Sequence, residues 1–171
     1  EAVTAPDAAG VAWLDEGELE ARIAHLRADA SATRSDRDAG QFSLAGAQPK
    51  LALLHGERGW AIPHGATPTT HILKPPLADL AGHAEVEHAC LALATEVGLA
   101  AARSEVRDFG AERVIVVERF DRRRVAGQWR RIHQEDLCQA LGVPPTSKYQ
   151  NEGGPTPAAI ASLLRVYSSR P

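Results

Sequence analysis

Two short apolar runs on either side of a glycine-bounded turn constrain the fold of this chain most strongly. The runs occupy residues 51–55 and 60–63, and Gly56-Glu57-Arg58-Gly59 separates them. Glycine accepts the backbone angles of tight turns, and two apolar runs joined in this way are typical of a β-hairpin. The chain is therefore expected to build a sheet around this hairpin.

Three further elements follow the hairpin. A β-branched, alternating run over residues 69–74 stops at two prolines, which predicts a strand whose last side chain is Lys74. Apolar residues recur at helical spacing from about residue 83 to 97, and a glycine follows this predicted helix. The nearly continuous β-branched run 113–120 predicts a strand that is buried on both faces.

An amphipathic helix is predicted upstream of the hairpin, over residues 15–28. Leu19, Ile23 and Leu26 lie on one of its faces, and Asp15 is placed to cap its first turn. Residues 29–41 have the polar, aperiodic composition of a connector.

Signals are weaker downstream of the last predicted strand. The arginine run 122–124 is expected to be a solvated turn, with contact to an anionic partner as the alternative. A short strand is expected over 129–132, a helix over 134–141 and a last helix that ends at about Tyr167.

Composition indicates a soluble globular domain. The 171 residues are 44% apolar and 24% charged, and the formal net charge of −3 provides no broad basic surface for nucleic acid. No apolar run approaches the ~20 residues of a membrane span, so no contact with a membrane is expected. Cys90 and Cys138 are expected to be free, buried thiols, which fits a cytoplasmic protein. The chain starts without methionine, which suggests a fragment.

The histidines do not predict a metal site. His71, His83 and His88 lack the paired spacing and the neighbouring carboxylates of zinc ligands, and the same holds for His133. No metal ligand is therefore assigned within this chain.

A loop of small residues precedes the hairpin, with the sequence Ser43-Leu44-Ala45-Gly46-Ala47-Gln48-Pro49-Lys50. Small side chains let backbone N–H groups approach an anion, and the lysine adds a positive charge. A plain turn before a strand is the alternative interpretation. The P-loop motif G-x-x-x-x-G-K-[ST] is excluded, because this loop has no second glycine before its lysine and no hydroxyl after it.

The order of these elements matches the small lobe of a protein kinase. In such a lobe a loop covers the phosphates of ATP, a strand lysine pairs with them, and a helix glutamate orients that lysine. Lys74 and Glu87 are the candidates for these two catalytic positions, and the last strand ends in Glu118-Arg119-Phe120. In a kinase, backbone groups of the segment after that strand hold the adenine. A solvent-exposed lysine at a strand end and a solvated helix glutamate are the alternatives.

Five sequence blocks in one order resemble the HipA family, the serine/threonine-kinase toxins of bacterial toxin–antitoxin pairs. They run from about residue 42 to 155 and are the loop 43–50, Pro68-Thr69-Thr70-His71-Ile72-Leu73-Lys74, Val117-Glu118-Arg119-Phe120-Asp121-Arg122, His133-Gln134-Glu135-Asp136-Leu137-Cys138-Gln139, and Lys148-Tyr149 before Gly153-Gly154-Pro155. The resemblance implies an α+β fold: a kinase-like small lobe with a mostly antiparallel sheet and a packed helix, then the start of a truncated helical large lobe. The domains would be 1–41 as linker with a helix, 42–121 as small lobe and 122–171 as incomplete large lobe.

The resemblance also implies roles for individual residues. Ala45, Gly46, Ala47, Gln48, Pro49 and Lys50 would contact the phosphates of ATP together with Lys74, and Glu118, Arg119 and Phe120 would contact the adenine. Ser43 would be the autophosphorylated serine that switches the kinase off, because a phosphate adds about −1.5 to −2 charges beside a phosphate-binding loop.

Cofactors and partners follow from the same resemblance. The protein would use Mg-ATP on a serine or threonine of a protein substrate, which in characterised members includes aminoacyl-tRNA synthetases. Its partner would be a HipB-like helix-turn-helix antitoxin, and operator DNA would be bound only through that complex. The family's catalytic Asp-Gly-His-x-x-Asn block and its metal-binding aspartate are absent from the 171 residues. An inert fragment, or a nucleotide- or antitoxin-binding module without phosphotransfer, is therefore the alternative function.

Overall fold

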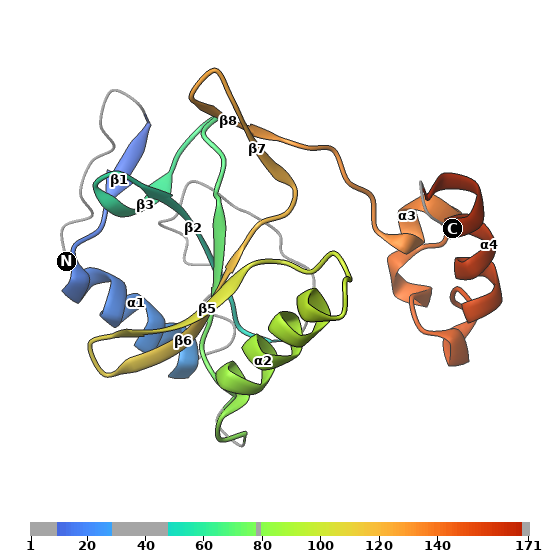
Figure 1. Cartoon of the computed structure of the whole chain (residues 1–171), viewed down its shortest axis with the longest axis horizontal. Coiled ribbons are helices and arrows are strands. Elements are labelled where there is room, and N and C mark those ends of the chain that lie inside the picture. The colour runs from blue at the N-terminus through green and yellow to red at the C-terminus, as the bar shows by residue number, and fades with distance from the viewer. Residues whose placement is uncertain (1–9, 29–47, 78–79, 169–171) are drawn as a thin grey trace. The chain divides into compact units, whose positions relative to one another are not determined.

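The computed structural model describes residues 10–28, 48–77 and 80–168, which form two compact units (Figure 1). The first unit extends to Arg131 and the second begins at Ile132. The domain boundaries expected after residues 41 and 121 stay predictions. The connector predicted over 29–41 lies outside the described residues.

The first unit is built on a six-stranded sheet in which every neighbouring pair of strands is antiparallel. Across the sheet the strands are β1 (Val11–Trp13), β3 (Gly59–Pro63), β2 (Leu51–Gly56), β4 (His71–Lys74), β6 (Glu112–Glu118) and β5 (Ser104–Phe109). A separate two-stranded ribbon contains β7 (Arg122–Val125) and β8 (Gln128–Arg131). The predicted α+β fold with a mostly antiparallel sheet is confirmed.

The predicted hairpin is the β2–β3 pair. Gly56 lies opposite Gly59, whose φ of +105° is a conformation that residues with a Cβ rarely adopt. Gly56 also makes room for packing, because a Cβ there would lie 2.9 Å from the Trp13 ring. The two glycines that bound the turn therefore serve the turn and the contact with β1.

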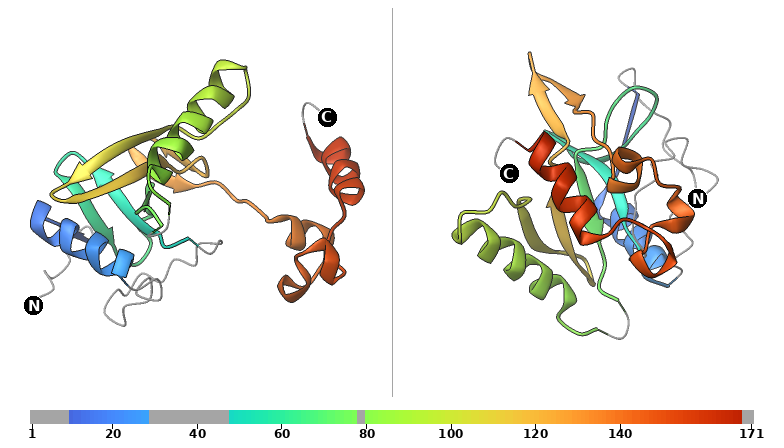
Figure 2. Two further views of the ribbon diagram at one scale, coloured as in Figure 1. Left: turned by 90° about the horizontal axis from the view of Figure 1, so that it is seen from below. Right: turned by 90° about the vertical axis from the view of Figure 1, so that its right-hand side faces the viewer.

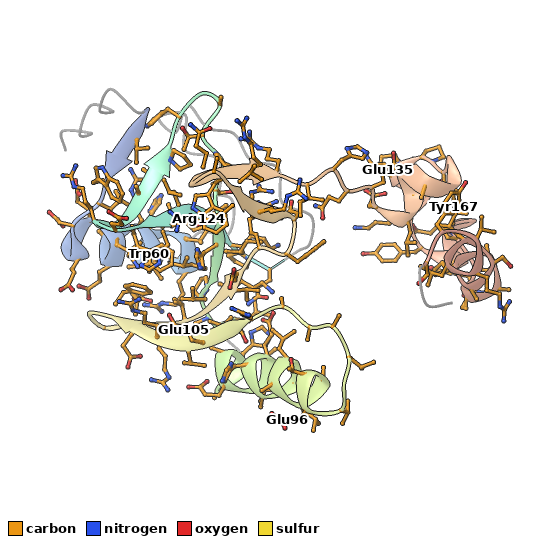
Figure 3. The ribbon with its side chains drawn as sticks, turned by 45° about the horizontal axis from the view of Figure 1, so that its top comes forward. Trp60, Glu96, Glu105, Arg124, Glu135 and Tyr167 are labelled. Carbon is orange, nitrogen blue, oxygen red and sulfur yellow. The ribbon has the colours of Figure 1, made fainter. Side chains whose placement is uncertain are left out.

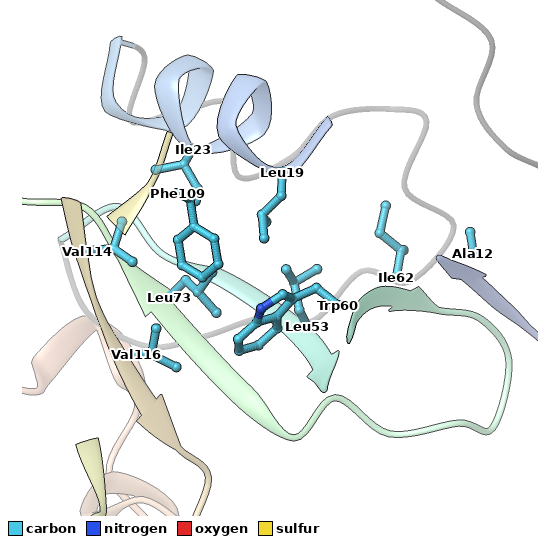
Figure 4. Packing of buried hydrophobic residues seen from close by; sticks show 10 residues of the cluster. All are labelled: Ala12, Leu19, Ile23, Leu53, Trp60, Ile62, Leu73, Phe109, Val114 and Val116. Atoms are coloured by element: carbon cyan, nitrogen blue, oxygen red, sulfur yellow. The ribbon is translucent and has the colours of Figure 1, made fainter. Parts of the chain in front are cut away.

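Helix α1 (Glu16–Ala28) covers one face of the sheet and completes the main core (Figure 4). Its Leu19 and Ile23 pack with Leu53, Leu73 and other strand residues, and each is at most 2% exposed. Burial of one such side chain stabilises the fold by about 1.5–3 kcal/mol. The helix begins as predicted, since Asp15 Oδ1 accepts the Glu18 N–H at 2.8 Å and Glu18 Oε2 accepts the Asp15 N–H at 3.0 Å.

Helix α2 (His83–Glu96) lies against β5 and β6 on the opposite face of the sheet (Figure 2). The opposite placement follows from the pleat, because α2 contacts Lys74 of β4, and Lys74 alternates with Leu73, which lies in the main core. The α2 residue His88 also contacts Ser104 of β5. Gly98 follows the helix with φ +85°, as expected of a C-terminal glycine.

The apolar stripe of α2 does not face the sheet. Val86, Leu93 and Val97 are more than 60% exposed, whereas Ala84 is 2% exposed. Cys90 is also exposed, so the prediction of a buried thiol is wrong for this residue; Cys138 is half-buried, and both thiols are free. The small Ala84 lets the helix approach the strands, and the larger apolar side chains of the stripe point away.

Two further expectations were wrong in detail. Arg122–Arg124 form strand β7 rather than a solvated turn, because Arg122 pairs with Arg131 and Arg124 with Trp129 of β8. Strand β6 is buried on both faces at Val114, Ile115 and Val116, but Arg113 is exposed and Val117 and Glu118 are half-buried. Strands β1, β5 and β7 had no clear signal in the sequence.

The second unit is helical. Helix α3 (Leu137–Leu141) begins later than predicted, because Asp136 is extended and caps it by accepting the Gln139 N–H. The short 3₁₀ turns Pro145–Ser147 and Gln150–Glu152 precede α4 (Pro157–Tyr167), which Thr156 caps and which ends at the predicted residue. No helix within the described ranges is long and apolar enough to cross a membrane.

An aromatic cluster lies at one end of the main core. The Trp60 ring (labelled in Figure 3) is 4.4 Å from the His55 ring and 5.4 Å from the His71 ring, between centroids. Burial lowers the pKa of both histidines; Arg107 adds to the effect at His55 and His55 adds to it at His71, against nearby glutamates. Both imidazoles are therefore held towards the neutral form in the folded protein.

This cluster predicts that the protein loses stability on mild acidification. An unfolded histidine titrates near pH 6.5, and the folded pKa of His55 and His71 lies lower, so the unfolded state binds more protons as the pH falls below about 6.5. Urea unfolding at a series of pH values between 7.5 and 5 should show a falling midpoint. The variant His71→Gln should flatten this dependence, whereas His133→Gln, at an 85% exposed side chain, should preserve it. Equal slopes in both variants would contradict the prediction.

Candidate functional site

Lys74 and Glu87 meet on the sheet face that α2 covers. Lys74 is the last residue of β4, and its Nζ donates to Glu87 Oε1 from the second turn of α2. The two side chains are 21% and 25% exposed, so the pair is partly shielded from water. The structure thus brings together the two residues predicted from the sequence, while their catalytic roles stay predictions.

Lys50 lies beside this pair. Lys50 directly precedes Leu51, which lies opposite Leu73, the residue before Lys74. Burial, and then the charge of Lys74, lower the pKa of Lys50, and Glu87 partly opposes this shift. The charged groups of Lys50, Lys74 and Glu87 therefore lie close enough to influence one another.

Gln48 fixes the end of the predicted phosphate loop. Its Nε2 lies 3.2 Å from the carbonyl oxygen of Pro75 and 3.2 Å from Nδ1 of His83, the first residue of α2. These contacts hold the chain before Lys50 against the end of β4 and the start of α2. Ser43, Ala45, Gly46 and Ala47 lie outside the described residues.

His83 is a site residue that sequence reasoning missed, since an isolated histidine without a ligand pattern carries no signal. Pro49, by contrast, belongs to the predicted set and is described at a half-buried position directly before Lys50. The described end of the loop, Gln48 to Lys50, therefore lies next to Lys74.

The predicted hinge continues from β6. The Glu118 N–H donates to Arg103 O at 2.8 Å, and the Arg119 N–H donates to Thr70 O at 2.9 Å. Phe120 follows with 75% of its surface exposed. The first two residues are thus bound into the sheet, and the third presents its ring to solvent.

A buried ion cluster braces the chain after the hinge. Asp121 is 5% exposed and accepts from Arg119 at 2.9 and 2.8 Å, and Arg122 Nη1 lies 2.7 Å from its Oδ2. Burial favours the neutral acid, but the two arginines outweigh it and lower the pKa of Asp121. Arg119 and Arg122 also donate to Oγ1 and O of Thr69, just before β4. Asp121 belongs to a block that resembles the HipA family, but the sequence alone did not predict this role for it.

Comparison with protein families identifies the domain. The model of the HipA-like C-terminal domain family matches residues 42–171. The chain belongs to this family. The match includes the loop, Lys74, Glu87 and the hinge of the HipA-like domain.

Two curated relatives carry kinase names. The chain is 49% identical over 132 residues to a Sinorhizobium fredii protein named "Putative kinase Y4mE", covering 77% of this chain and 31% of the relative. It is 36% identical over 117 residues to the serine/threonine-protein kinase toxin HipA of Shewanella oneidensis, covering 67% of this chain and 26% of the toxin. The HipA-like chain thus spans about a third or less of these relatives.

A solved structure agrees with the fold. The complex of Shewanella oneidensis HipA with HipB and operator DNA contains a chain that matches with a TM-score of 0.65 and 27% identity. The match covers 90% of this chain and 35% of that one. The expected kinase-toxin family and its fold are therefore confirmed.

Among the described residues of this HipA-like domain, no three His, Cys, Asp or Glu side chains come together in a group that could hold a metal ion. Glu87 is engaged by Lys74, and Asp121 by two arginines. In the described part of the site, these carboxylates therefore pair with basic side chains.

The charges of the site predict opposite shifts of the Lys50 pKa in two variants. Lys74→Met removes a neighbouring cation and should raise the pKa of Lys50, whereas Glu87→Gln removes an anion and should lower it. Titration of the lysine side-chain resonances by NMR measures both shifts. Arg113→Gln, which removes the exposed partner of Glu85, serves as a control with no expected effect. Shifts of the same sign in the first two variants would refute the arrangement.

Proposed function

We propose that this chain is the ATP-binding part of a HipA-like serine/threonine protein kinase. The observation that carries the proposal is the Lys74–Glu87 ion pair, whose two charges also act on the nearby Lys50. A strand lysine paired with a helix glutamate is the arrangement by which kinases hold a lysine against ATP phosphates. The family membership and the kinase names of the relatives support the same reading.

The proposed ATP-binding residues form two groups, one for the phosphates and one for the adenine. Lys50 and Lys74 would neutralise phosphate oxygens, and the loop from Ala45 to Lys50 would add backbone N–H groups. Glu118, Arg119 and Phe120 would hold the adenine, chiefly through main-chain groups of the hinge. Magnesium would arrive with ATP and supply charge neutralisation, and its protein ligands would come from outside this chain.

Phosphate transfer needs more than this part of the protein. A carboxylate that accepts the substrate hydroxyl proton is required, and the family's Asp-Gly-His-x-x-Asn block does not occur in the 171 residues. The chain alone should therefore bind ATP and transfer little or no phosphate. Within the complete protein, the acceptor would be a serine or threonine of a protein, with aminoacyl-tRNA synthetases as the candidate class.

A HipB-like antitoxin is the proposed partner of the complete protein. The support is the match to a HipA chain solved with HipB and operator DNA. The chain's own net charge of −3 agrees with contact to operator DNA through the antitoxin rather than directly. The proposed location is the cytoplasm, where ATP, the synthetases and the operator are found.

Titration with Mg-ATP tests the proposal on this chain. Calorimetry should detect weak binding, and Lys74→Ala should abolish it because a phosphate contact and the partner of Glu87 are both lost. Lys148→Ala, at an exposed lysine of the second unit, is the matched control and should bind ATP normally. If Lys74→Ala binds ATP as well as the unaltered chain, the proposed role of Lys74 and the loop is wrong.

The proposed switch at Ser43 can be tested on the same chain. Ser43→Glu places negative charge in the loop and should weaken ATP binding severalfold, because the charge repels the phosphates. Ser43→Ala should bind like the unaltered chain, and Ser35→Glu controls for added charge elsewhere in the preceding segment. Equal weakening by Ser43→Glu and Ser35→Glu would refute a local effect of the loop.

A further inference from the structure

The β7–β8 hairpin concentrates positive charge in an otherwise acidic chain. Residues 122–131 include five arginines and no acidic residue, although the whole chain has a net charge of −3. The strands place Arg122 opposite Arg131 and Arg123 opposite Arg130. Like charges directly opposite each other destabilise a strand pair.

One face of the hairpin uses its arginines to dock on the sheet. Arg122 donates to Thr69 O and Asp121 O, and Arg131 donates to the carbonyl oxygens of Ala66 and Thr67. On the same face, Trp129 packs against a small cluster of Val11, Leu54 and Ala61, and the Arg124 guanidinium lies 5.7 Å from its ring centroid. The role of this face is therefore structural. Arg124 is labelled in Figure 3.

The other face carries Arg123, Val125, Gln128 and Arg130, which alternate with the docking residues. Arg123 and Arg130 are exposed. Among the described residues, Arg130 donates to Gln128 Oε1 and neither arginine has an acidic partner. This face therefore presents two guanidinium groups to solvent from directly opposed positions.

The hairpin holds this pair at a cost in stability. Ala126 in its turn has φ +49°, a left-handed conformation that is unfavourable for a residue with a Cβ. The hairpin therefore combines an unfavourable backbone conformation in its turn with like charges at opposed strand positions. Such departures are expected where a surface is kept for binding.

We propose that the Arg123–Arg130 face of β7–β8 binds a phosphorylated residue of a partner protein. Cβ atoms of opposed residues lie about 4.5–5.5 Å apart, so both guanidinium groups can reach one phosphate. A phosphomonoester carries about −1.5 to −2 charges and three acceptor oxygens, which match two arginines with paired N–H donors. Gln128 adds a further donor at the same face.

A nucleic acid is the less suitable partner. Its affinity comes from many phosphate contacts along a strand, and this face offers two arginines within a chain of net negative charge. A single phosphoryl group, in contrast, is matched by two arginines alone. The proposal concerns the hairpin and does not depend on ATP binding at Lys74.

Fluorescence anisotropy with a labelled glycine/alanine peptide that carries one phosphoserine tests the proposal. The chain should bind this peptide, and its unphosphorylated twin should not compete. Arg123→Gln with Arg130→Gln should weaken binding at least tenfold. Arg58→Gln with Arg165→Gln removes the same charge from exposed positions elsewhere and should change binding less than twofold. Lys74→Ala should retain binding, which separates the hairpin from the nucleotide site.

Thermal unfolding supplies a second readout and a check on folding. The double hairpin variant loses a like-charge pair, so its midpoint should be equal to or higher than that of the unaltered chain. Phosphopeptide should raise the midpoint of the unaltered chain and leave that of the double variant unchanged. The proposal is overturned if the double variant binds normally, if the unphosphorylated peptide or inorganic phosphate binds equally well, or if a ten-nucleotide single strand binds more tightly through the same arginines.

Discussion

The two-residue alternation of strand β4 is the constraint on which both the core and the site depend. Leu73 is completely buried among the residues under α1, and the next residue, Lys74, points to the other face and meets Glu87. The pairs Leu51–Leu73 and Lys74–Ile115 fix this register from both sides of the strand. A slip of one residue would bury the ammonium group and expose the leucine, which would cost stability and dismantle the site together. The fold therefore cannot be kept while Lys74 is misplaced.

Helices and strands whose own residues show turn glycines or a regular apolar pattern could be predicted from the sequence. Strands that form only because they pair with a neighbouring strand could not. The β2–β3 hairpin has glycines at its turn, and α1 has a regular apolar face with an acidic cap. Strand β5 has a mixed charged and apolar sequence, and it is formed by six paired positions along β6. The three arginines at the start of β7 have no strand preference of their own; the docking of Trp129 and the backbone carbonyls that accept from Arg122 and Arg131 hold them in place.

Part of the site was predictable because kinase-like order brings a strand lysine near a helix glutamate, but the orientation of α2 was not. The helix has two usable faces. The sequence favours the stripe with Val86 and Leu93, whereas the structure packs the face with Ala84 and Glu87 against the sheet. Only this orientation brings Glu87 to Lys74, while His88 Nδ1 lies 3.0 Å from Ser104 Oγ. In this orientation the apolar stripe with Val86 and Leu93 is exposed.

The hinge and the end of the loop are held in place by contacts of different strength. Asp121 is bound by Arg119 and Arg122 over 2.7–2.9 Å, and both arginines also reach Thr69. Breaking a buried charge cluster of this kind typically costs about 3–5 kcal/mol, so the hinge and the start of β4 should move as one body. The end of the loop is held by Gln48 through two contacts of 3.2 Å to Pro75 O and His83 Nδ1. Neutral hydrogen bonds contribute about 0.5–1.5 kcal/mol each, so a new charge in the loop should displace the Gln48 end while the hinge and Lys74 stay in place.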